Sequence, residues 1–187
     1  MAALAAPGVA YACACCANRG DQTQQTARIT QFELVELVRL RFGTAAHLRT
    51  TPGFPADIKG LKPVATRYRL SQTRHARIFV LTFRDARGTK GTLGFALPER
   101  AARLAVDLQD GRRSAGGGPL LYREWRLDGR ITATGIFAGA GSPRFRLVLQ
   151  GRGNACMNAS DFRSWILQVT GPKAAFTFYG AFGRPAA

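Results

Sequence analysis

The feature that most constrains the fold of this chain is a period of two in its apolar residues. In "ARIFVLTFRD" the side chains of Phe79, Leu81 and Phe83 fall on one side of the backbone, and Ile78 and Val80 fall on the other. Successive side chains of a β-strand point to opposite faces, so this spacing predicts a strand that is covered on both faces. The segment "ARGTKG" then predicts a turn into "TLGFALP", which makes residues 76–98 the clearest hairpin in the chain.

Short alternating segments of this kind fill most of the chain. They include "RYRLS", "RLAVDL", "LLYREWRL", "ITATGIFAG", "RFRLVLQG", "DFRSWILQV" and "AAFTFYG", and Gly, Pro, Asp or Asn separate them. The glycine-rich loop 110–119 joins the two halves. About ten strand candidates and no clear helix predict an all-β domain, either an antiparallel β-sandwich or an up-and-down β-barrel. The close spacing of successive strands favours a meander.

The segment "ITQFELVELVRLRF" at the start of this domain carries a less regular pattern. A strand would place five apolar residues on one face, with Glu36 out of pattern, and these residues are Phe32, Leu34, Val38, Leu40 and Phe42. The spacing therefore predicts a long strand or a strand with a bulge, and a helix is the alternative.

The N-terminus has the pattern of an export signal. Residues 1–12 are mostly Ala, Leu and Val without charge, and Ala10 and Ala12 match an Ala-x-Ala cleavage site before Cys13. The expected organisation is a signal segment at 1–12, a Cys-rich polar leader at 13–28 and one domain at 29–187. The expected location is periplasmic or secreted. A lipid anchor on Cys13 is the lesser alternative, since Ala10 stands where a lipoprotein signal has Leu. No run is long enough for a transmembrane helix.

Three of the four cysteines cluster at the start of the leader, and the fourth lies far along the chain. The residues are Cys13, Cys15, Cys16 and Cys156. In an oxidising compartment the favoured fate is a disulfide, which predicts that one leader cysteine is bonded to Cys156. The alternative is a Cu(I) or thiol-redox site that uses these four thiolates with the Met157 thioether, because soft ligands suit Cu(I).

The charge of the chain indicates an anionic partner. It contains 27 Lys or Arg against 11 Asp or Glu, a formal net charge of +16. The expected partners are an anionic ligand, an envelope component or an acidic protein, and nucleic acid is less favoured. The arginines are scattered without a compact basic run, so their use as ordinary solvated cations is the competing interpretation.

Two polar segments supply candidate ligand contacts. Alternation in "LLYREWRL" places Tyr122, Glu124 and Arg126 on one strand face and Trp125 on the other, and the loop around Cys156 gathers Asn154, Asn158, Asp161 and Arg163. Cross-strand ion pairing and turn formation are the structural alternatives for these residues. An enzyme acting on an acidic glycan is a third functional possibility, with His47, Glu124 and Asp161 as its first candidates. No catalytic motif singles them out.

A signal segment before "CACCA", an all-strand body and the run "GRGNAC" together resemble small uncharacterised exported proteins of proteobacteria. The resemblance spans most of the chain and implies an envelope location. It carries no functional residue. The sequence thus favours an exported binding or interaction module with a basic surface.

Overall fold

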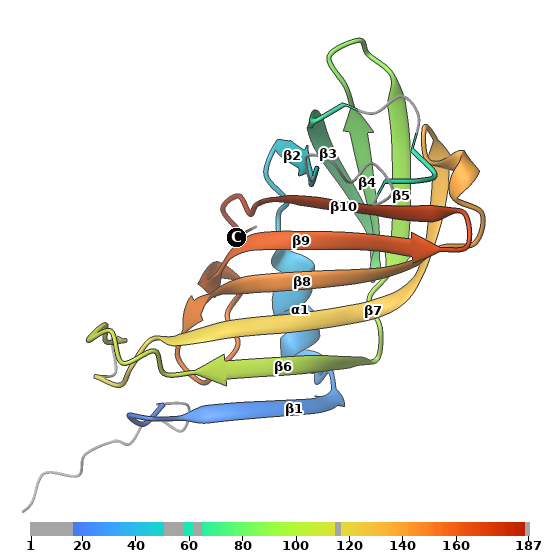
Figure 1. Ribbon diagram of the computed structural model, residues 1–187. Coiled ribbons are helices and arrows are strands. Elements are labelled where there is room, and N and C mark those ends of the chain that lie inside the picture. The colour runs from blue at the N-terminus through green and yellow to red at the C-terminus, as the bar shows by residue number, and fades with distance from the viewer. Residues whose placement is uncertain (1–16, 51–57, 62–64, 115–116, 186–187) are drawn as a thin grey trace, which may run out of the picture.

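The computed structural model describes residues 17–50, 58–61, 65–114 and 117–185, in which nearly all regular structure is antiparallel sheet (Figure 1). The elements are β1 (Gln22–Arg28), α1 (Gln31–Arg39), β2 (Ala45–Leu48), β3 (Arg67–His75), β4 (Ile78–Arg84), β5 (Lys90–Ala96), β6 (Arg100–Val106), β7 (Leu121–Gly135), η2 (Ala138–Ala140), β8 (Arg144–Gly153), η3 (Ala159–Asp161), β9 (Phe162–Gly171) and β10 (Ala174–Ala181). None of the described helices is long and apolar enough to cross a membrane.

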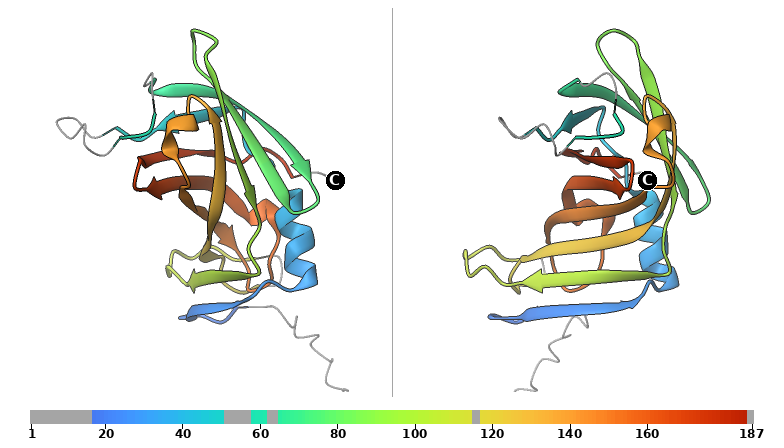
Figure 2. Two further views of the ribbon diagram at one scale, coloured as in Figure 1. Left: turned by 90° about the vertical axis from the view of Figure 1, so that its right-hand side faces the viewer. Right: turned by 45° about the vertical axis from the view of Figure 1, so that its right-hand side comes forward.

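The strands form a closed up-and-down barrel with a two-strand extension. The sheet order is β1-β6-β7-β5-β4-β3-β2-β10-β9-β8, and pairing of β7 with β8 closes the ring. One edge of β7 is shared, because residues 122–126 pair with β6 and residues 131–135 pair with β5. In Figures 1 and 2, β3, β4 and β5 run across the direction of β8, β9 and β10, and β7 bends from one direction to the other. The all-β prediction is confirmed, and the barrel replaces the sandwich alternative.

The interior of the barrel is filled by aromatic side chains. Phe83 stacks on Phe178 with 4.5 Å between ring centroids, and Phe137 packs edge-on to both rings. The ring centroids of Phe95 and Phe145 are 4.6 Å apart, and these two rings are tilted against each other. Beside α1, a cavity of about 10 Å³ lies among apolar side chains, which is at the lower limit for one water molecule. The interior of the described barrel is therefore a packed core.

Residues 31–39 form helix α1, so the predicted strand is wrong here and the helical alternative holds. Thr30 is the N-cap: its Oγ1 accepts from the Glu33 N–H at 3.3 Å, and Glu33 Oε2 accepts from the Thr30 N–H at 2.8 Å. This reciprocal capping box starts a helix at a position where alternation alone suggests a strand. Leu37 is fully buried against the barrel, whereas Phe32 is 60% exposed.

Three further details differ from the expected strands. The predicted strands "LLYREWRL" and "ITATGIFAG" are largely one continuous strand, β7. Residues 22–28, expected in the polar leader, form the edge strand β1 beside β6. The outer face of β4 is not covered, since Ile78 is 47% exposed, while the hairpin of β4 and β5 is confirmed. A covered inner face and a solvated outer face are typical of antiparallel sheets.

Candidate anion-binding groove

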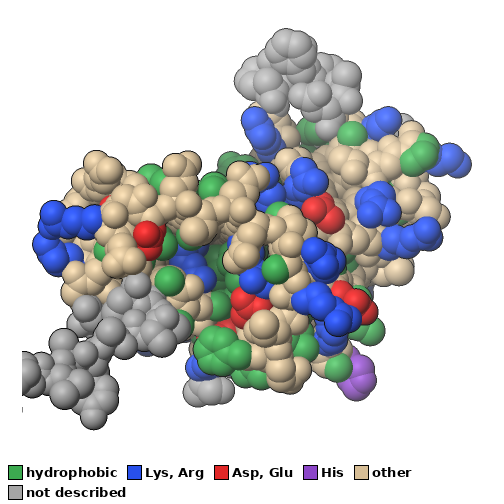
Figure 3. All heavy atoms as spheres, turned by 90° about the horizontal axis from the view of Figure 1, so that it is seen from below, with side chains coloured by type: hydrophobic (Ala, Val, Ile, Leu, Met, Phe, Trp, Pro, Cys, Tyr) green, Lys and Arg blue, Asp and Glu red, His purple; other side chains and the backbone are tan. Residues whose placement is uncertain are grey.

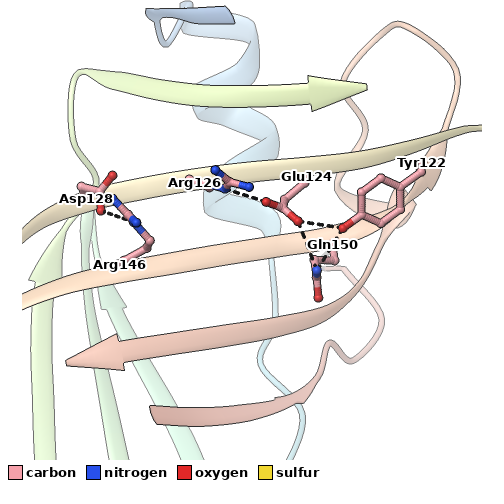
Figure 4. A network of polar contacts seen from close by, with 6 residues as sticks. All are labelled: Tyr122, Glu124, Arg126, Asp128, Arg146 and Gln150. Atoms are coloured by element: carbon pink, nitrogen blue, oxygen red, sulfur yellow. Dashed lines mark hydrogen bonds and ion pairs between the residues drawn. The ribbon is translucent and has the colours of Figure 1, made fainter. Parts of the chain in front are cut away.

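The candidate ligand residues of β7 are divided between the two faces of the sheet, as alternation requires. Trp125 points inward and is 2% exposed, with the Arg103 guanidinium 4.5 Å from its ring centroid. Tyr122, Glu124 and Arg126 share the outer face, where Gln150 of β8 joins them (Figure 4). Trp125 is thus a core residue and cannot contact a ligand together with the other three.

The outer-face residues satisfy one another. Glu124 accepts from Tyr122 Oη at 2.7 Å, from Arg126 Nε at 2.6 Å and from Gln150 Nε2 at 3.2 Å (Figure 4). Burial opposes ionisation of Glu124, but these three hydrogen bonds outweigh it and lower its pKa. Burial and the bond to Glu124 raise the pKa of Tyr122. Because the network is charge-balanced and internally bonded, the ion-pairing alternative describes it better than a ligand site does.

The loop between β8 and β9 is held from inside the sheet. Arg123 Nη1 lies 2.9 Å from Asp161 Oδ2 and also donates to the carbonyl of Cys156. Glu36 of α1, itself buried, accepts from the Ala159 N–H at 2.7 Å. A side chain at Gly151 or Gly153 of the "GRGNAC" run would overlap Asp161.

The remaining predicted residues of this loop have structural roles or face solvent. Asn158 caps η3 through its Oδ1, which accepts from the Ser160 N–H at 3.0 Å. Asn154 is partly exposed, and Arg163 is exposed. Burial raises the pKa of Asp161 although Arg123 opposes the shift, and burial lowers the pKa of Arg123 although Asp161 opposes it. The polar residues that the sequence gathers around Cys156 therefore build the loop, in agreement with the turn-forming alternative.

The cysteine prediction falls mostly outside the described residues. Cys13, Cys15 and Cys16 lie there, so their pairing stays a prediction. Cys156 is partly buried, and its bonding to a leader cysteine likewise stays a prediction. Met157 is 5% exposed and belongs to the core cluster.

The charges of the chain separate into an acid-poor region and a region that contains the ion pairs. Residues 40–98 contain eleven Lys or Arg and two Asp or Glu. Every ion pair between described residues lies outside this segment, on β1, α1, β6 to β9 and their loops. On the face seen in Figure 3, the few acidic side chains lie next to basic ones. The described part of the segment 40–98 thus concentrates cations that form no ion pair with another described residue.

Three of these cations line one surface groove. The groove has a volume of about 840 Å³ and lies over β3 between the start of β2 and the turn from β4 to β5. Its lining includes Arg67, Arg69 and Arg84, and we call it the arginine groove. The lining carboxylate is Asp85, whose Oδ1 accepts from the Arg87 and Thr89 N–H groups at 2.9 and 2.8 Å. Asp85 therefore organises the turn and forms no ion pair with the three arginines.

The strand register aligns the cations in a row. Arg69 is the cross-strand partner of Arg84, and Arg84 is the partner of Lys90 on β5. Directly opposed side chains on one face of a sheet lie close together, and like charges in such positions destabilise it. The row is a local concentration of positive charge that a bound anion would relieve.

An aromatic pair borders the same groove. His47 of β2 is the register partner of Arg67 and of Tyr179 on β10. The two rings stack with 5.4 Å between centroids, and Tyr179 is 47% exposed. His47 is therefore next to the groove, but Glu124 lies on the outer face of β7 and Asp161 on its inner side, so the three enzyme candidates do not come together.

Sequence reasoning missed the groove because it judged clustering along the chain. The signals available were the acid-poor composition of residues 40–98 and the alternation in "RYRLS", which puts Arg67 and Arg69 outside once Tyr68 and Leu70 are inside. Comparisons with protein families, curated proteins and solved structures give no match for this chain.

Proposed function

We propose that this protein is an exported binding module that recognises an anionic ligand at the arginine groove. The observation that carries the proposal is the placement of Arg67, Arg69 and Arg84 around one concavity without a carboxylate partner. Guanidinium groups offer forked donors that match carboxylate, sulfate and phosphate oxygens, so three in one groove suit an anion.

The filled barrel supports a binding role because it provides a rigid platform. The side chains under the groove, Tyr68, Leu70 and Phe83, are 5% exposed or less and belong to the aromatic core. Arginines anchored on such strands lose less conformational freedom on binding than arginines on a mobile loop.

Export is supported by the proposed disulfide between Cys156 and the N-terminal cysteine cluster. Protein disulfides persist mainly in oxidising compartments. Such a bond would weaken the Cu(I) alternative, since a disulfide sulfur is not a thiolate ligand, and the Met157 thioether is buried in the core. Copper remains the second proposal for the reduced leader cysteines, and anaerobic Cu(I) titration of the reduced protein tests it.

The groove is tested by measuring the affinity for dextran sulfate, a polymeric anion, at two salt concentrations. The variant Arg67→Gln/Arg69→Gln/Arg84→Gln loses three donors that each contribute about tenfold in affinity when bonded to a charged group, so binding should fall by well over tenfold. The dependence of affinity on salt should weaken as well, because fewer charges are neutralised on binding.

A matched control separates a site from the effect of net charge. Arg130, Arg163 and Arg184 are exposed, form no ion pair among the described residues and lie on β7, on β9 and in the C-terminal segment. Their triple Gln variant loses the same formal charge and should keep most of the affinity. Equal losses in the two variants would show that net charge alone attracts the polymer, and the proposed site would then be abandoned.

A further inference from the structure

Beside the cation row, the outer face of the barrel carries a row of hydroxyl groups. Ser71 of β3 is the partner of Thr82 on β4, Thr82 is the partner of Thr92 on β5, and Thr92 is the partner of Thr134 on β7. Four neighbouring strands thus present a hydroxyl at the same register. Ser71 and Thr134 are exposed, and Thr82 and Thr92 are partly exposed.

The two rows run parallel across the strands. Ser71, Thr82 and Thr92 are each two positions along their strand from a member of the cation row, so both rows lie on the same face, about 7 Å apart. Neighbouring members of a row are separated by the strand spacing, about 4.8 Å. A ligand that contacts both rows must therefore lie across β3, β4 and β5 rather than along one strand.

The hydroxyls differ in their capacity to bind a ligand. Those of Thr92 and Thr134 are hydrogen-bonded to each other. Those of Ser71 and Thr82 make no hydrogen bond within the described structure. Two free hydroxyls next to Arg69 and Arg84 can exchange hydrogen bonds with a ligand that has both hydroxyl and acidic groups.

From these two rows we infer that the anion is an acidic glycan, an inference that rests on the proposed function. Its acidic groups lie on Arg69, Arg84 and Lys90, and its sugar hydroxyls lie on Ser71 and Thr82. Hydroxyl side chains donate and accept hydrogen bonds, as sugar hydroxyls do, whereas a phosphate oligomer at neutral pH presents mainly acceptors. The exposed Tyr179, which stacks on His47 one strand away from Arg67, adds a ring on which the apolar face of a sugar can pack.

The test compares trigalacturonate with tripolyphosphate by isothermal titration of the full chain. The variant Ser71→Ala/Thr82→Val should weaken trigalacturonate binding about 3- to 30-fold and leave tripolyphosphate binding within about twofold. Thr73→Val, whose residue lies one row farther from the cations, is the matched control and should change neither affinity. Val keeps the branched shape that strands favour, and circular dichroism checks that each variant is folded.

Three outcomes would decide against the glycan. If Ser71→Ala/Thr82→Val weakens the binding of both ligands equally, or of neither, the hydroxyl row does not recognise the sugar. Binding to phosphatidylglycerol vesicles without binding to trigalacturonate would indicate a lipid headgroup. In each of these cases the groove itself survives if Arg84→Gln still weakens tripolyphosphate or vesicle binding. If Arg84→Gln binds both ligands as tightly as the wild type does, the proposed function is wrong as well.

Discussion

Arg69 of β3 lies directly opposite Arg84 of β4, and neither forms an ion pair within the described structure. Lys90 continues the row on β5. A fold gains nothing from three neighbouring cations on one sheet face, because their repulsion is unfavourable. This arrangement is expected where a surface is kept for an anion rather than for stability, since binding sites are often built at a cost to the fold.

Replacing Arg69 should therefore stabilise the protein while it weakens ligand binding. Arg69→Thr removes one like-charge contact and introduces a good strand former, so the free energy of unfolding should rise by up to about 1 kcal/mol at low salt. The gain should shrink in high salt, which screens the repulsion. Urea unfolding at two salt concentrations measures both effects. Arg67→Thr, whose partner is His47, is the control and should gain less; a stability loss in Arg69→Thr would contradict the cost assigned to the row.

The buried pair of Arg123 and Asp161 should be costly to break on one side. Arg123→Met leaves Asp161 without its cation and the Cys156 carbonyl without this donor, so the protein should lose about 3 kcal/mol or more. The double variant Arg123→Met/Asp161→Leu removes both charges. Its loss in free energy of unfolding should be smaller than the sum of the losses in the two single variants. Denaturant unfolding of all three variants gives the coupling. Simple additivity would mean that the pair does not hold the loop.

Glu124 should make the stability of the protein dependent on acid pH. Its pKa is lowered in the folded state, so its contribution is present above the ordinary pKa of a glutamate and is lost as the pH falls through the folded value. Between about pH 5 and pH 3 the wild type should lose more stability than Glu124→Gln, which cannot titrate. Thermal unfolding at these pH values measures the difference. Parallel melting curves for the two proteins would argue against the hydrogen bonds shown in Figure 4.

The N-cap of α1 should contribute measurably to stability. Thr30→Ala removes the side-chain oxygen that accepts from the Glu33 N–H and should cost about 1 kcal/mol. Thr30→Asp supplies a new acceptor near the positive end of the helix dipole and should retain most of the stability. Thermal unfolding compares the two. Equal losses would indicate that the cap adds little beyond the packing of Leu37.

The partner of Cys156 is predicted to be a leader cysteine. Trypsin cleaves after Arg19, Arg152 and Arg163, so a non-reducing digest should contain the leader peptide linked to the peptide 153–163. Fragmentation of that product identifies the leader cysteine, for which Cys15 or Cys16 is expected before Cys13. Cys156→Ser should lower the melting temperature of the oxidised protein, because the bridge would close a loop of about 140 residues. Free alkylation of all four thiols in periplasmic material would rule the bridge out.

Much of the barrel could be predicted from the alternation of apolar residues. The inward sets of β4 and β5, Phe79, Leu81, Phe83, Leu93 and Phe95, are buried as their spacing requires. Local polarity fixes which side of a strand faces a core, and turn residues fix where strands end. Alternation could not distinguish a sandwich from a barrel, because closure of the barrel depends on the pairing of β7 with β8 in the folded protein.

The helix shows the limit of this reasoning. Over residues 29–42 a period of two and a helical period both match most apolar positions, and the decision falls to the Thr30 and Glu33 cap and to the packing of Leu37 into the barrel. Short apolar segments are ambiguous until tertiary contacts select one state. The burial of Glu36 against the Ala159 N–H likewise needs two segments more than a hundred residues apart.

The sequence by itself determined the all-β class, the inward and outward faces of most strands and an excess of positive charge. Only the tertiary structure decided where that charge lacks partners. Arg67 and Arg69 lie together on β3, but one turn and most of β4 separate them from Arg84, and a second turn separates Arg84 from Lys90. The grouping of these four residues therefore depends on the register of three strands. Charge interactions act through space over about a Debye length, whereas the sequence shows only which residues are neighbours along the chain. For that reason arginines that are scattered in the sequence form one groove in the folded protein.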